Sequence, residues 1–205
     1  MMKRLFALLL VLTAFSAAGQ NIVSDFAKSL AEGCATFGYT YSMSGQVPLS
    51  GSGTIRLQGD AFVMQGDGLE VYCDGATRWT VDTVAEECYI ESVEPGGLDY
   101  EANPALLVGA VDKAFKLKKT ASATFNSKKV TEAMLVPVSD GGNITEISLM
   151  MASEKKPEGI LVKTSDGNVI TVVVKDFTVA GKAPAENFGY DTKKLSSGYI
   201  VTDLR

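Results

Sequence analysis

The stretch LEVYCDGATRWTV, residues 69–81, decides the fold because it places two short runs of alternating side chains around one turn. In the first run Leu69 and Val71 alternate with polar or aromatic neighbours, which is the two-residue period of a half-buried β-strand. Asp74-Gly75 follows, a dipeptide typical of hairpin turns in which glycine accepts a positive φ. A second strand is expected over residues 77–81. The stretch therefore predicts an antiparallel hairpin.

The same alternation continues on both sides of this hairpin through most of the chain. Turn residues separate the runs, among them Asp67-Gly68 and the stretches 140–143, 155–159 and 166–168. No linker, internal repeat or low-complexity tract interrupts the pattern, which predicts one mainly β domain of about ten antiparallel strands. The runs with a strand pattern lie at residues 37–43, 54–58, 61–65, 69–73, 77–81, 88–93, 121–125, 130–138, 144–151, 159–163, 169–174 and 199–201.

Two segments have a helical pattern instead. Residues 21–33 place apolar side chains at the i, i+4, i+8 spacing and end in a glycine. Asn103-Pro104 combines an N-cap residue with a first-turn proline, and the helix expected from there to about Phe115 is apolar nearly all round. Because two helices are few for so long a sheet, we expect the sheet to curl and the second helix to close a hydrophobic cavity as a lid. A normally packed barrel core is the alternative.

The N-terminal segment has the pattern of a secretory signal peptide. Lys3 and Arg4 precede an apolar run over residues 5–15, within the roughly 7–15 residues of such signals and below the ~20 that cross a bilayer. Small residues then predict cleavage before Gln20, with cleavage after Ala18 as the second choice. The expected division is residues 1–19 as a cleaved signal peptide and residues 20–205 as one exported, soluble domain.

The composition excludes several chemistries. The chain contains no histidine, which removes imidazole-activated nucleophiles, His-ligated zinc and a histidine pH switch. Nineteen Lys and Arg against 24 Asp and Glu give a net charge of −5, and no basic run exceeds a lysine pair, so nucleic acid is not an expected partner. Acidic residues at turns are expected to be solvated rather than catalytic. No enzyme activity, metal or cofactor is predicted.

The three cysteines, Cys34, Cys73 and Cys88, match no zinc or thioredoxin motif. An oxidising compartment would allow one disulfide and one free thiol, whereas the pattern favours three small, partly buried side chains. If a disulfide exists, the spacing does not choose its partners.

Taken in order, several motifs resemble the periplasmic outer-membrane lipoprotein carrier family, LolA, and its LolA-like relatives. The most specific is Asp74-Gly75-x-Thr77-x-Trp79, which follows Val71. The others are Gly53-x-Ile55-x-Leu57, Phe62, Cys88-Tyr89-Ile90, Asn103-Pro104, Phe188-Gly189-Tyr190 and the C-terminal Val201-Thr202-Asp203-Leu204-Arg205.

The resemblance implies an eleven-stranded, incompletely closed antiparallel barrel with a helical lid and a hydrophobic cavity. We predict that the cavity is lined by Phe62, Met64, Val71, Trp79, Met134, Ile147 and Leu149. The predicted lid residues are Leu106, Leu107, Val111 and Phe115. Relatives often carry Arg-Pro just before the aromatic that matches Phe62, and that Arg hydrogen-bonds the lid. This chain has Gln58-Gly59-Asp60 there, so Gln58 is the expected, neutral lid latch.

The resemblance also implies a function. Family members hold acyl chains of lipoproteins, receive them from an inner-membrane ABC transporter and pass them to an outer-membrane acceptor. We therefore expect a monomeric periplasmic carrier of acylated lipoproteins or lipids. Two alternatives of related fold are a glycolipid carrier and a sensor or adaptor for mislocalised lipoproteins. An exported enzyme that uses carboxylates is a third, disfavoured by the composition.

Overall fold

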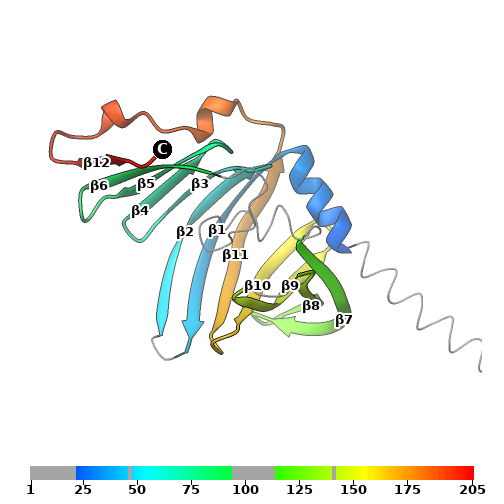
Figure 1. Ribbon diagram of the computed structural model, residues 1–205. Coiled ribbons are helices and arrows are strands. Elements are labelled where there is room, and N and C mark those ends of the chain that lie inside the picture. Colours follow the sequence, from blue (N-terminus) through cyan, green and yellow to red (C-terminus); the bar gives the residue numbers. More distant parts are fainter. Residues whose placement is uncertain (1–21, 46–47, 94–113, 140–141) are drawn as a thin grey trace, which may run out of the picture. The chain divides into compact units, whose positions relative to one another are not determined.

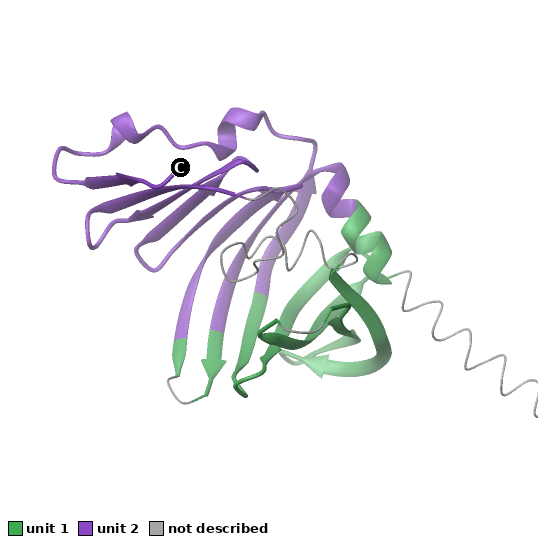
Figure 2. Ribbon diagram, viewed as in Figure 1, with its two compact units in different colours: residues 1–28, 42–49, 111–173 green, residues 29–41, 50–110, 174–205 purple. Residues whose placement is uncertain are grey.

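The computed structural model describes residues 22–45, 48–93, 114–139 and 142–205, and the predicted signal peptide lies outside these ranges. The chain divides into two compact units (Figure 2). Unit 1 takes its residues from Met1–Lys28, Ser42–Leu49 and Val111–Val173. Unit 2 takes its residues from Ser29–Tyr41, Ser50–Ala110 and Val174–Arg205.

Within the described ranges, twelve strands pair in one sheet in the order β12-β6-β5-β4-β3-β2-β1-β11-β10-β9-β8-β7 (Figure 1). The order does not close, because β12 and β7 are its two ends. This confirms the predicted fold class, mainly β with a single unclosed antiparallel sheet. Strands β1, β2 and β11 contribute residues to both units.

The N-terminal helix covers residues 22–32 and confirms the helix predicted from the apolar spacing. Its buried side chains include Val23, Phe26 and Leu30, which share one face of the helix. Gly33 follows the last helical residue, and a Cβ there would lie 2.4 Å from the carbonyl oxygen of Ala180. Only glycine fits this close approach, so the helix ends where the chain passes β11.

Unit 2 contains an antiparallel meander with one parallel strand at its edge. Its strands are β1 (Cys34–Ser44), β2 (Leu49–Gln58), β3 (Ala61–Gly66), β4 (Leu69–Cys73), β5 (Thr77–Asp82), β6 (Glu87–Ser92) and β12 (Ile200–Asp203), with the end of β11 (Val169–Ala180). The β12 strand is parallel to β6, whereas an antiparallel strand was predicted there. The long connection after β11 allows the chain to enter the sheet in this direction, which a tight hairpin does not permit.

Unit 1 contains the remaining strands. They are β7 (Phe115–Phe125), β8 (Lys128–Pro137), β9 (Ile144–Ser153), β10 (Lys156–Thr164) and the first part of β11. The β7–β8 hairpin turns through Asn126 and Ser127, whose φ angles of 47° and 63° define a primed turn that the sequence analysis did not predict. The unit 1 sheet curls enough for the ring of Phe125 on β7 to lie against Gly159 on β10.

The two predicted Asp-Gly turns have different geometries. Asp67 and Gly68 both have positive φ, 52° and 81°, as a type I′ hairpin turn requires. At the second turn only Gly75 has a positive φ, 96°, and the Asp74 carboxylate instead accepts hydrogen bonds from the backbone N–H groups of Ala76 and Thr77. This second connection is therefore built on an aspartate side chain.

All three cysteines lie in the described ranges, and all three are free and buried. Burial raises the pKa of the Cys73 and Cys88 thiols. These side chains therefore act as small apolar residues, which is the interpretation that the sequence analysis favoured.

Candidate functional site

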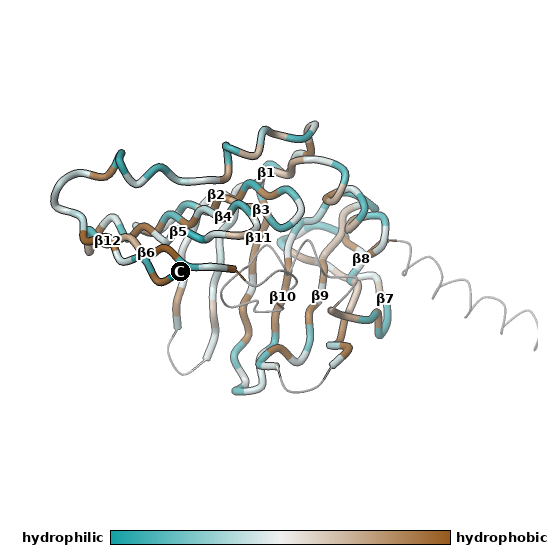
Figure 3. Tube along the Cα trace, turned by 45° about the horizontal axis from the view of Figure 1, so that its top comes forward, coloured by the Kyte–Doolittle hydropathy of each residue, from teal (hydrophilic) through white to brown (hydrophobic). Residues whose placement is uncertain are grey.

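An apolar wall lies on one face of the unit 1 sheet. The strand register aligns Ala133 with Leu149 and Ile160, and aligns Leu135 with Ile147 and Val162. Each of these six side chains is at most 7% exposed. Apolar positions recur along β8, β9 and β10 in Figure 3. We call this set the unit 1 wall: Ala133, Leu135, Ile147, Leu149, Ile160 and Val162.

The unit 1 wall contains two of the three unit 1 residues predicted for the cavity. Ile147 and Leu149 belong to it, but Met134 pairs with Ser148 and therefore lies on the opposite face of the sheet. That face is partly polar, since Ser148 Oγ donates a hydrogen bond to Glu132 Oε1 at 2.7 Å. Met134 is thus not on the same surface as the other two residues.

A second apolar wall lies on one face of the unit 2 sheet. Leu57 pairs with Phe62, Phe62 with Cys73, and Met64 with Val71. The predicted residues Phe62, Met64 and Val71 therefore lie together on this face. The sequence analysis did not predict Ile55, Leu57 and Cys73 as residues of this surface. Alternation along β2 and β4 would have placed them there. We call the set the unit 2 wall: Ile55, Leu57, Phe62, Met64, Val71 and Cys73.

Trp79, the fourth unit 2 residue predicted for the cavity, lies on the other face. It pairs with Tyr72 on one side and Ile90 on the other, whereas Val71 pairs with Thr80. Trp79 packs, together with Tyr190 from the C-terminal part of the chain, against a buried cluster that contains Val81 and Cys88. It therefore belongs to the structural core of unit 2 rather than to its apolar wall.

The segment after β11, residues 181–205, covers this second face before it enters the sheet as β12, and we call it the C-terminal strap. Phe188 is completely buried and packs against Cys34 and Val63. The Arg56 guanidinium carbon lies 5.2 Å from the centroid of the Phe188 ring, and Arg56 Nη2 donates a hydrogen bond to the Asn187 carbonyl oxygen. The strap is thus held by an aromatic anchor with a cation on its face.

A pair of tyrosine rings adds a second contact between the strap and the sheet. The Tyr72 and Tyr190 ring centroids are 4.7 Å apart. Burial, together with the hydrogen bond that its hydroxyl donates to Glu70 at 2.9 Å, raises the pKa of Tyr72 to about 12. The hydroxyl therefore stays protonated and keeps its donor role throughout the neutral range.

Gln58, the predicted lid latch, forms two hydrogen bonds to the strap. Its Nε2 donates to the Ala183 carbonyl oxygen at 3.1 Å, and its Oε1 accepts from the Ala183 N–H at 2.7 Å. The physical reason is strand alternation. Leu57 belongs to the unit 2 wall, so the next residue, Gln58, lies on the opposite face, which the strap covers. Both polar atoms of the Gln58 amide thus bond the strap, and a role of Gln58 as a lid latch stays a prediction.

We expect Gln58→Ala to lower the free energy of unfolding by about 1–3 kcal/mol, because both backbone groups of Ala183 lose their partner. Urea denaturation measures this loss, and faster hydrogen exchange of the Ala183 amide assigns it to the strap. Gln65→Ala is the control. Gln65 is exposed and its amide donates to the Tyr72 hydroxyl rather than to the strap, so a change of about 0.5 kcal/mol is expected. An unchanged rate of hydrogen exchange at the Ala183 amide would show that Gln58 does not hold the strap.

Three of the four predicted lid residues, Leu106, Leu107 and Val111, lie outside the described residues. The fourth, Phe115, is the first residue of β7, where it is buried and pairs with Pro137. The predicted helix therefore does not include Phe115. The strand begins at this residue, earlier than predicted, because the lysine-rich stretch that follows Phe115 hides the alternation of a strand. Within the described ranges, no helix has the length and apolar content to cross a bilayer, and no group of three or more metal-ligating side chains is found.

The sequence matches no protein-family model, and no curated protein matches it. Solved structures do resemble the fold. An uncharacterised conserved protein from Thermus thermophilus has a TM-score of 0.56 at 11% identity, over 91% of this chain and 99% of that one. A LolA superfamily protein from Nitrosomonas europaea has a TM-score of 0.50 at 10% identity, over 84% of this chain and 97% of that one.

The sheet topology and these likenesses define the class of the protein: a mainly β chain built on one unclosed antiparallel sheet with an N-terminal helix. More particularly, the fold is LolA-like, as the sequence motifs predicted.

Proposed function

We propose that this chain is a carrier that binds the acyl chains of lipoproteins or other lipids. The observation that carries the proposal is the unit 1 wall, six apolar side chains from three adjacent strands with no polar group among them. An entirely apolar surface of this kind matches an acyl chain in polarity. The LolA-like fold supports the same class of function.

The finer parts of the proposal concern transport. We propose a periplasmic protein that receives acylated cargo from an inner-membrane ABC transporter and delivers it to an acceptor in the outer membrane. Release requires moderate affinity. Burying one CH₂ group contributes about 0.8 kcal/mol, so a ~16-carbon chain in a fully apolar site would bind by up to ~12 kcal/mol. Because the wall side chains are already buried, an acyl chain must replace apolar protein contacts, and the net affinity is the smaller difference between the two.

Binding of an uncharged acyl probe tests the proposal. The probe is a monoacylglycerol with a fluorophore at the end of its chain. We expect Val162→Thr to weaken its binding about fivefold to tenfold, because the substitution keeps the side-chain shape and adds a hydroxyl to the wall. Fluorescence titration gives both affinities, and thermal unfolding confirms that both proteins are folded at the temperature used.

Val136→Thr is the matched control. Val136 follows Leu135 on β8, so it lies on the opposite face, and its half-buried side chain accepts the same change. Its affinity for the probe is expected to stay within twofold of the parent. If the parent protein fails to bind the monoacylglycerol, or if both variants bind it equally, the unit 1 wall is not an acyl site.

A further inference from the structure

The face that carries the unit 1 wall becomes polar toward the β7–β8 hairpin. Along β8 the side chains on this face are Leu135, Ala133, Thr131 and then Lys129, at every second residue. On β7, Ser122 pairs with Thr131 and Thr124 pairs with Lys129. One surface of the sheet thus changes from aliphatic to hydroxyl to ammonium over a few residues. That order is the polarity profile of an amphiphile.

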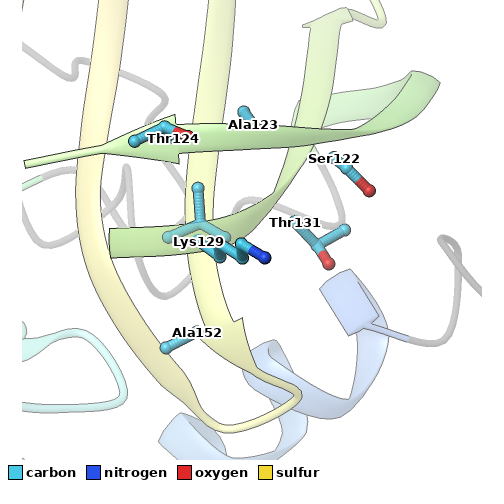
Figure 4. Close-up of a pocket in the computed structure, with 7 residues that line it drawn as sticks. Ser122, Ala123, Thr124, Lys129, Thr131 and Ala152 are labelled. Carbon is cyan, nitrogen blue, oxygen red and sulfur yellow. The ribbon is translucent and has the colours of Figure 1, made fainter. Parts of the chain in front are cut away.

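Two open hollows lie at this polar end. The first has a volume of about 650 Å³ (Figure 4) and the second about 530 Å³. Thr131 lines both, so the hollows adjoin, and Met151, which pairs with Thr131, connects the second hollow to β9 beside Leu149. The first hollow is lined by Ser122, Ala123, Thr124, Lys129, Val130, Thr131 and Ala152. The second is lined by Ile22, Thr131, Met151, Ser153, Glu154 and Lys155.

The charge at the two hollows is positive. Lys129 and Lys155 line them and are exposed, and neither is in any of the ion pairs found among the described residues. By contrast, the adjacent Lys128 is paired with the buried carboxylate of Glu158. Glu154 is the one carboxylate among the lining residues of these two hollows, and it lies in the second.

We infer that Ser122, Thr124, Lys129 and Thr131 form a headgroup site for a phosphate-bearing lipid whose acyl chain lies on the unit 1 wall. An ammonium group and three hydroxyl groups can all donate to phosphate oxygens, and hydrogen bonds with a charged donor and acceptor are the strongest of this kind. The inference rests on the proposed function, because the wall supplies the site for the chain. It adds the substrate class, an amphiphile with an anionic phosphate head.

Two lipids that differ only in the phosphate test the inference. Lysophosphatidic acid and monoacylglycerol with the same labelled chain are titrated into the full-length protein at low salt. We expect lysophosphatidic acid to bind about tenfold more tightly, since hydrogen bonds to a charged group are worth roughly one power of ten in affinity. Lys129→Gln is expected to abolish most of this preference, because it should weaken lysophosphatidic acid binding far more than monoacylglycerol binding.

Lys119→Gln is the matched control, because it removes the same charge from the same hairpin. Lys119 is exposed and pairs with Met134, so it lies on the face opposite Lys129 and Thr131, and its loss should leave the tenfold preference intact. Glycerol phosphate, which has the head without the chain, distinguishes a lipid headgroup from free phosphate. It is expected to compete only at far higher concentration than lysophosphatidic acid.

The other outcomes overturn the inference in separable ways. Equal affinity of the two lipids, or equal loss of preference in both lysine variants, removes the headgroup site and leaves the acyl carrier standing. Tight binding of glycerol phosphate alone would make this a site for free phosphate. If neither lipid binds, the proposed function fails together with the inference.

Discussion

Phe188→Ala is expected to lower the free energy of unfolding by about 3–5 kcal/mol. The ring is completely buried and fills the space between Cys34 and Val63, so its removal leaves a cavity in addition to the lost apolar burial. Arg56 adds to the cost, because its guanidinium group lies over the ring and its bond to Asn187 depends on the position of the strap.

Urea denaturation measures the loss, and the intrinsic fluorescence of Trp79 locates it. Trp79 is the single tryptophan of the chain and packs beside the strap residue Tyr190, so release of the strap should shift its emission to longer wavelength. Leu204→Ala is the control in the same strap, because Leu204 is 60% exposed, and it should change stability by no more than about 0.5 kcal/mol. Equal effects of the two substitutions would show that Phe188 does not anchor the strap.

Local patterns in the sequence were sufficient to predict most of the fold. Alternation identified the strands because a half-buried sheet exposes every second residue, and the apolar face of residues 22–32 identified the helix. The clearest failure is at residues 115–120, where β7 begins before the predicted position. Its lysines interrupt the apolar alternation. On a strand at the end of the sheet these lysines remain exposed, so the strand forms although the alternation is interrupted.

The candidate site was harder to predict because it depends on register between strands. Ile147 and Leu149 share a face by alternation along a single strand, so no register was needed to place them together. Whether Trp79 shares a face with Val71 depends on the turn between them. A pairing of Cys73 with Thr77 would have aligned them, but Cys73 pairs with Arg78, and this shift of one residue moves Trp79 to the opposite face.

The C-terminal strap was the part of the structure that local patterns could not reveal. Phe188 and Tyr190 stand in a segment with no strand or helix period, and their partners Val63 and Tyr72 are more than a hundred positions away in the chain. Gln58 gave a usable signal, since alternation after the apolar Leu57 places it on the face opposite the wall. The same alternation, read for the face of the sheet opposite the unit 2 wall, would have predicted that a further segment covers that face.

Gly159→Ala is expected to destabilise unit 1 by about 3 kcal/mol, the upper end of the usual cost of overpacking. A Cβ at this position would lie 2.3 Å from Cε1 of Phe125 and 2.5 Å from the carbonyl oxygen of Val172. The ring can rotate away, but the carbonyl belongs to the adjacent strand β11, so β10 and β11 must separate locally. Thermal unfolding measures the effect, and Gly181→Ala, with no atom within 4 Å of its Cβ, should leave stability nearly unchanged.

A double substitution divides this cost between its two causes. Phe125→Ala removes the aromatic clash and leaves the backbone clash. It should therefore lower the free energy of unfolding less in the Gly159→Ala background than in the parent protein, where there is no clash to relieve. The remaining loss then measures the separation of β10 and β11. Because Gly159 is next to Ile160 of the unit 1 wall, that separation should also weaken monoacylglycerol binding. A Gly159→Ala protein as stable as the parent would mean that the curl of the unit 1 sheet does not bring Phe125 against β10.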